Sequence, residues 1–126
     1  MKIFSGDIGG LVFRAYSSFI GPNYYFFGIT YNGFYIFGLA PQEVGPVLNT
    51  APSSAIKKGK FQQNSLTVVA MNASMYLYIN KQYVAMVSDS AYSSGNIGLA
   101  ATTTFNDPNA DLNADVAFNN AQVWKL

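Results

Sequence analysis

Residues 64–99 read NSLTVVAMNASMYLYINKQYVAMVSDSAYSSGNIGL, and this stretch decides the fold that the sequence predicts. Apolar and polar residues alternate in it with period two, and Asn, Ser and Gly interrupt the pattern at short intervals, as in strands joined by tight turns. Asn72 and Asn80 stand at two of the interruptions, where Asn adopts left-handed backbone at little cost. The stretch therefore predicts consecutive antiparallel strands.

The same pattern continues outward in both directions, with turn residues about every eight to twelve positions. It predicts an all-β fold, a single antiparallel β-sandwich domain over residues 1–126. Residues 51–58 form either one helical turn or a loop. The predicted strands are Gly9–Tyr16, Asn23–Tyr31, Phe34–Ala40, Ser65–Met71, Met75–Ile79, Tyr83–Ser88, Asn96–Thr102 and Ala114–Trp124.

Composition limits the function classes. Half of the residues are hydrophobic and 16% are aromatic, which is far too apolar for a disordered chain. No apolar run approaches the roughly 20 residues that a membrane helix needs, so we expect no membrane insertion. The formal net charge is +1 and the lysines form no stripe, which disfavours nucleic acid as a partner. Cysteine is absent, so disulfides and thiolate metal sites are excluded.

The densest aromatic segment surrounds the dipeptide Asn32-Gly33, which is a strong hairpin signal. The loop has either three residues, with Gly33 as a bulge, or two residues. The two alternatives direct the side chains of the second strand to opposite faces of the sheet. We favour the three-residue loop because it collects the larger aromatic set in one core. That core face would hold Tyr25, Phe27, Ile29, Tyr35 and Phe37, and the opposite face Tyr24, Phe26, Phe34 and Ile36.

In either register, some aromatic side chains face away from the sandwich interior. There they either stack on a sugar ring or pack against another strand or subunit. The first interpretation gives a candidate ligand site, in which aromatic rings supply stacking faces and the hairpin supplies hydrogen bonds. Its residues are Tyr24, Phe26, Tyr31, Asn32 and Phe34.

The sequence offers little for catalysis. Histidine is absent, which removes the usual triads and the commonest proton shuttle. Glu43 is the only glutamate, and no predicted strand carries the pair of carboxyl groups that glycoside hydrolysis usually requires. We expect no enzyme activity, and we interpret the aspartates as turn and cap residues.

One segment has oxygen-bearing side chains at alternate positions, a spacing compatible with calcium. These are Asp107, Asn109 and Asp111. The match to an EF-hand-like loop fails at its sixth and twelfth positions, which hold Leu112 and Phe118. We therefore expect no cofactor and interpret the segment as an Asx-rich loop, with calcium as the alternative.

Several segments, in their order, resemble concanavalin A-like jelly-roll domains, and most closely the laminin G-like and keto-disaccharide-hydrolase-like domains of bacterial envelope and signalling proteins. They include GLVFRA (10–15), NYYFFGI (23–29), NSL (64–66), LYIN (77–80), YSSGNIGL (92–99) and VAFNNAQVW (116–124). These motifs mark strands and core positions, so they are informative about fold and poor guides to activity.

The resemblance implies a non-catalytic binding or sensor module, carbohydrate-directed and exported as part of a larger bacterial protein, in the cell envelope or outside the cell. Residues 1–7 show no export signal. Such domains usually have several strands before the segment that matches Gly9–Tyr16. Loss of those strands would leave unpaired edges, so we expect a homodimer or strand-exchanged assembly. The alternatives are a structural or assembly domain that uses its aromatic face, and a disfavoured glycosidase-like enzyme.

Overall fold

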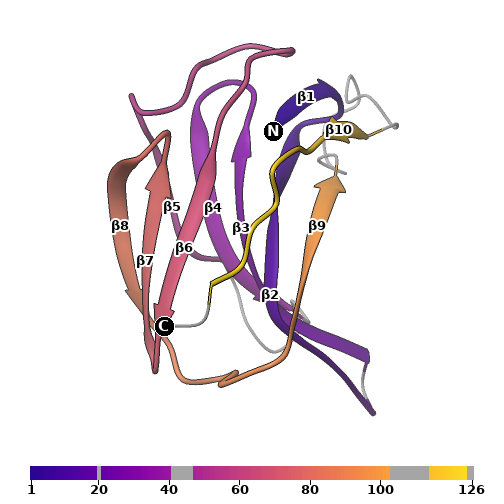
Figure 1. Cartoon of the computed structure of the whole chain (residues 1–126), viewed down its shortest axis with the longest axis vertical. Helices are drawn as coiled ribbons and strands as arrows, with labels where there is room; N and C mark the ends of the chain where they lie inside the picture. Colours follow the sequence, from indigo (N-terminus) through magenta and orange to yellow (C-terminus); the bar gives the residue numbers. More distant parts are fainter. Residues whose placement is uncertain (20, 41–46, 103–113, 125–126) are drawn as a thin grey trace.

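The computed structural model describes residues 1–19, 21–40, 47–102 and 114–124. Within these ranges the chain contains strands, turns and irregular segments but no helix (Figure 1). The strands are β1 (Lys2–Ser5), β2 (Ile8–Ser18), β3 (Gly21–Thr30), β4 (Phe34–Ala40), β5 (Val47–Pro52), β6 (Leu66–Met71), β7 (Ser74–Ile79), β8 (Gln82–Ser88), β9 (Asn96–Thr102) and β10 (Asp115–Ala117).

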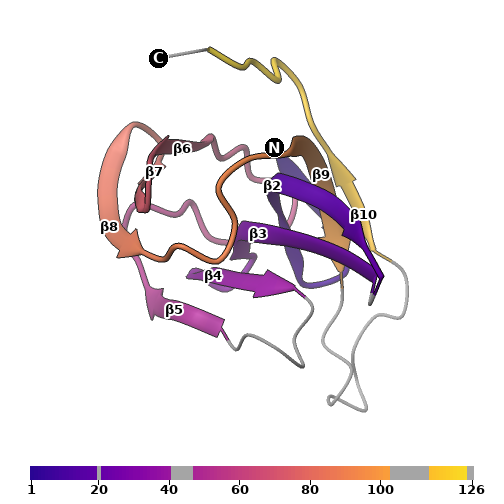
Figure 2. The same cartoon turned by 90° about the horizontal axis from the view of Figure 1, so that it is seen from below.

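The strands form two main antiparallel sheets. One has the order β5-β4-β3-β2-β9 and the other the order β6-β7-β8, and β1 pairs with β10 separately. Figures 1 and 2 show β6–β8 as a layer opposite the five-stranded sheet. The predicted all-β antiparallel architecture is therefore confirmed.

The core lies between these layers and follows directly from the period of a strand. In β7, alternate side chains are fully buried, namely Met75, Leu77 and Ile79. They join one cluster with Tyr25 and Phe27 of the opposite sheet. Burying an aliphatic or aromatic side chain contributes about 1.5–3 kcal/mol each, so this double layer supplies much of the driving force for folding.

The β3–β4 hairpin has the predicted three-residue loop. The Gly33 N–H donates to the Thr30 carbonyl at 3.2 Å, and Gly33 has a φ of 102°. This turn places Phe27 opposite Phe37, so both rings point into the core. The preferred distribution of the aromatic residues between the two faces is confirmed, because the Gly33 bulge sets the register.

The asparagine turns are also confirmed. Asn72 and Asn80 both have positive φ, at 55° and 51°. Asn80 does more than turn the chain, since its side-chain amide donates to Asn64 Oδ1 at 2.8 Å. Asn64 is buried and exchanges two hydrogen bonds with the backbone of Lys57. These contacts fasten the loop before β6 to the β7–β8 turn.

The edges of the fold differ from the sequence-based expectation. The last strand was predicted over Ala114–Trp124, but the described chain is in a strand only over Asp115–Ala117, the part that pairs with β1. In the segment 51–58, predicted as a loop or one helical turn, the first two residues end β5 and residues 53–58 form the loop without a helix. β1, which precedes β2, was not predicted. These short segments are strands because of partners distant in sequence, and their own periodicity is too brief to show it.

Candidate functional site

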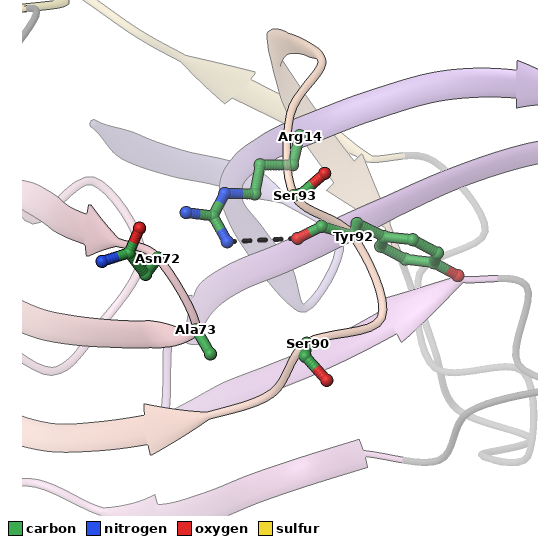
Figure 3. A pocket seen from close by; sticks show the side chains of 6 residues that line it. All are labelled: Arg14, Asn72, Ala73, Ser90, Tyr92 and Ser93. Atoms are coloured by element: carbon green, nitrogen blue, oxygen red, sulfur yellow. Dashed lines mark hydrogen bonds between the residues drawn. The ribbon is translucent and has the colours of Figure 1, made fainter.

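A hollow of about 310 Å³ lies at one end of the sandwich, where the two main sheets are linked (Figure 3). The segment 89–95 crosses there from β8 to β9, that is, from the three-stranded to the five-stranded sheet. The β6–β7 turn and β2 supply the other walls. The lining residues are Arg14, Asn72, Ala73, Ser90, Tyr92 and Ser93.

A β-bulge in β2 directs Arg14 toward this hollow. Arg14 has a φ of 50°, and the pairing of β2 shifts register between Phe13 and Tyr16 on one side and between Val12 and Ala15 on the other. A bulge bends a strand and re-aims its side chains. The guanidinium donates from Nη1 to the Tyr92 carbonyl at 3.1 Å (Figure 3).

The segment 89–95 is held by side chains of the core. The Tyr25 hydroxyl donates to Asp89 Oδ1 at 2.5 Å and accepts from the Tyr92 N–H at 3.2 Å. Asp89 Oδ1 also accepts from the Ala91 N–H at 2.9 Å. The Tyr92 hydroxyl donates to the Ala40 carbonyl. These hydrogen bonds fix the wall of the hollow.

Gly95 permits the close approach of this segment to β2. Its φ is +149°, and a Cβ atom placed there would lie 2.5 Å from the Ala15 carbonyl oxygen. No side chain larger than hydrogen fits at that distance. The contact holds the 89–95 segment against the bulge that carries Arg14.

The two tyrosines of this network are neutral at physiological pH. Burial is the main cause that raises the pKa of Tyr25 to about 12, and the hydrogen bond to Asp89 adds to it. Burial also raises the pKa of Tyr92. Within the described part of the chain, the only hydrogen bond of the Arg14 side chain is to the Tyr92 carbonyl, and no carboxylate pairs with it. Among the described residues that line the hollow, Arg14 is the one charged side chain.

An exposed aromatic ring lines a second hollow beside the first. Tyr16 is 46% exposed, and its ring meets Tyr92 edge-on, with centroids 5.5 Å apart at 84°. This second hollow has a volume of about 340 Å³ and shares Tyr92 and Ser93 with the first. Charged, hydroxyl and aromatic groups thus meet at one end of the fold.

The structure separates the five residues that the sequence analysis proposed as a ligand site. Tyr24 and Phe26 lie on the outer face of β3, where the Phe26 ring covers Gly28. Phe34 lies on the same face at the far end of the hairpin and is 42% exposed. Thr30 ends β3 and lies next to Phe34. It is six residues from Tyr24, which is about 20 Å along a strand.

The other two proposed residues lie at the hairpin loop. Tyr31 is half-buried against the core, and Lys60 Nζ lies 5.2 Å from its ring centroid. Asn32 is exposed, and its Oδ1 accepts a hydrogen bond from Thr30. Two of the proposed residues therefore lie along β3 and the other three at or beside the hairpin loop, and their role in binding stays a prediction.

The calcium alternative concerns residues outside the described part of the chain, because Asp107, Asn109 and Asp111 all fall in 103–113. Among the residues that are described, no three His, Cys, Asp or Glu side chains gather in a way that could hold a metal ion. The described ranges also contain no helix with the length and hydrophobicity of a membrane span.

Sequence reasoning did not identify the hollow. Arg14 appeared only within a structural motif, and Asn72 and Asp89 only as turn and cap residues. One signal was present, since Arg14 is the sole arginine of the chain and stands inside a predicted apolar strand. A charged residue in such a strand marks either an edge, a bulge or a site.

Comparison with known proteins supports the fold. No protein-family profile and no curated protein sequence matches the chain. Among solved structures, the chain is similar to the carbohydrate-binding module CBM66 from Bacillus subtilis, with a TM-score of 0.61 and 21% sequence identity. The match covers 78% of this chain and 62% of that one. At this identity the likeness establishes a jelly-roll type of β-sandwich, as the sequence predicted, and leaves the laminin G-like or keto-disaccharide-hydrolase-like branch a prediction.

Proposed function

We propose that this chain is a non-catalytic carbohydrate-binding module and that its ligand occupies the hollow beside Arg14 and Tyr16. The observation that carries the proposal is the meeting, on a prearranged backbone, of a guanidinium, several hydroxyl and amide groups and an exposed aromatic ring. Sugars present hydroxyl groups on their edges and C–H groups on their faces, and such a site matches both. The fold shared with CBM66 adds support.

The outer aromatic surface of the β3–β4 hairpin is the competing location for the same function. Phe34 and Tyr16 are almost equally exposed, at 42% and 46%, so their alanine variants make a matched pair. The assay is affinity electrophoresis of the wild type and both variants in gels that contain soluble polysaccharides. For each polysaccharide that slows the migration of the protein, the dissociation constant is then measured by calorimetry.

We expect Tyr16→Ala to weaken glycan binding about two- to tenfold, since an aromatic contact contributes about 0.5–1.5 kcal/mol. Phe34→Ala should bind like the wild type. The reverse result would move the ligand to the hairpin surface. Absence of binding to every glycan, by a wild-type protein shown to be folded, would reject carbohydrate binding altogether.

A second candidate, assembly with another copy of the chain, is favoured by β9. Leu99 lies opposite Leu11, which in turn lies opposite the buried Phe27, so Leu99 belongs to the inner face of the sheet. It is nevertheless 48% exposed, and Ile97 is 59% exposed. Within the described chain, β9 is also an edge strand. Uncovered inner-face residues beside an open edge favour pairing with a second copy, as a homodimer or by strand exchange.

Light scattering after size exclusion tests this assembly. We expect a dimer at micromolar concentration, and we expect Leu99→Lys to give a monomer. A wild-type monomer over the whole concentration range would contradict the assembly and leave the glycan proposal intact.

We also propose that the module acts outside the cell or in the cell envelope, as an exported part of a larger bacterial protein. The motifs shared with domains of envelope and signalling proteins support this location. Protease treatment of intact cells, followed by detection of the module with an antibody, provides the test. Protection of the module in intact cells and its digestion after lysis would contradict export.

A further inference from the structure

The charge of the hollow allows a more specific statement about the ligand, one that rests on the proposed carbohydrate function. A guanidinium has five N–H donors and no acceptor. In the described structure, Arg14 uses Nη1 on the Tyr92 carbonyl. Figure 3 shows the other nitrogen atoms of the Arg14 guanidinium on the side away from Tyr92, toward Asn72. The half-buried Arg14 thus presents an oriented, partly dehydrated cation to a ligand.

The other lining side chains do not neutralise this charge. Ser90, Ser93 and Asn72 are exposed and bring hydroxyl and amide groups without charge. Asp89 is the nearest acid along the lining segment, and its Oδ1 faces the Tyr25 hydroxyl and the Ala91 N–H. Asp89 is also not among the residues that line the hollow. An acidic group of a ligand would meet donors there.

The attraction is local to this end of the molecule. The whole chain has a formal net charge of only +1, so it exerts little general pull on polyanions. Arginine also prefers planar carboxylates, which it binds through two parallel hydrogen bonds at about 2.7–2.9 Å. A neutral sugar hydroxyl gains at most one weaker bond from the same group.

We propose that the hollow recognises a carboxylate-bearing sugar, a uronic acid residue within an oligosaccharide. Arg14 binds the carboxylate, Asn72 and the serines contact ring hydroxyls, and Tyr16 lies against the apolar part of the sugar. The recognised chemistry is the carboxylate. Esterification, which keeps the sugar and removes the charge, should therefore remove most of the affinity.

The test is calorimetry with oligogalacturonate, oligoglucuronate and oligomannuronate, each compared with its own methyl ester. For the uronate that binds, we expect the acid to bind at least tenfold more tightly than the ester, the scale of one charge-assisted hydrogen-bond pair. Arg14→Gln should abolish this difference and Arg14→Lys should restore part of it. Lys81→Gln is the control, because Lys81 is an exposed lysine of the β7–β8 turn and does not line the hollow.

The outcomes distinguish a failure of uronate recognition from a failure of carbohydrate binding in general. Equal affinity for acid and ester, or binding to neutral glycans alone, would overturn uronate recognition and leave carbohydrate binding in place. Equally tight binding to dextran sulfate would also overturn it, as general charge attraction. Binding to no glycan, acidic or neutral, would overturn both. Because the comparison of acid with ester uses the wild-type protein, the test holds even if an Arg14 variant fails to fold.

Discussion

Replacing Gly95 by alanine should damage both the stability of the fold and the hollow. A Cβ atom at this position would lie 2.5 Å from the Ala15 carbonyl oxygen, 2.6 Å from the Arg14 carbonyl carbon and 2.7 Å from the Ala15 nitrogen. All three are backbone atoms, so no side-chain rotation relieves the contact. The 89–95 segment must move away from the β2 bulge.

The size of the effect can be worked out with Gly21 as a reference. Gly21 also has positive φ, +117°, but a Cβ atom there would have no other atom within 4 Å. Gly21→Ala therefore costs only backbone strain, roughly 1–2 kcal/mol. Gly95→Ala carries a similar strain, and the forced displacement adds roughly 1–3 kcal/mol, as overpacking usually does. The total is roughly 2–5 kcal/mol.

Urea unfolding followed by far-ultraviolet circular dichroism measures both variants. Because the slope for small domains is about 1–3 kcal/mol per M, a loss of about 3 kcal/mol lowers the midpoint by about 1–3 M. Glycan affinity should also fall in Gly95→Ala and remain unchanged in Gly21→Ala. If the two variants were destabilised equally, the argued contact between Gly95 and the bulge would be refuted.

Three further predictions follow from other parts of the structure. Asn64→Ala should lower the free energy of unfolding by about 1–3 kcal/mol, since it removes the partner of the Lys57 backbone N–H and carbonyl and of the Asn80 amide. The exposed neighbour variant Gln63→Ala should change it by less than about 0.5 kcal/mol in the same urea titration. The raised pKa values of Tyr25 and Tyr92 favour the neutral hydroxyl in the folded state, so the stability that they contribute is complete below pH 10.0 and is lost as the pH rises above it. For Tyr25 the loss extends to about pH 12, where its folded-state pKa lies. Unfolding curves across that range should show the decline, and Tyr25→Phe should flatten it; a Tyr25→Phe profile as steep as that of the wild type would contradict the assignment. Calorimetric titration with calcium should give a flat trace, and a saturable heat would favour the calcium alternative for residues 103–113.

Strand periodicity carried most of the fold prediction. The alternation in β3 and β4 identified the buried face of each strand, and the collection of the larger aromatic set on one face favoured the register that the hairpin has. These features depend on neighbouring residues, and local sequence reports them well. β1 was not predicted and β10 was predicted too long, because each is short and gains its strand structure from the other. The same limit applies to β5, an edge strand defined by its pairing with β4.

Local sequence patterns were enough to predict an antiparallel all-β fold, the core-facing side chains of the β3–β4 hairpin and the catalytic residue types that the chain lacks. Only the tertiary structure brought Arg14 to Tyr92, a residue 78 positions away, and closed a polar hollow between them. The difference is the distance along the chain over which each feature is set. The face of a strand is set by a two-residue repeat, whereas this hollow depends on a bulge, a crossing segment and a glycine contact that form only when the two sheets pack together.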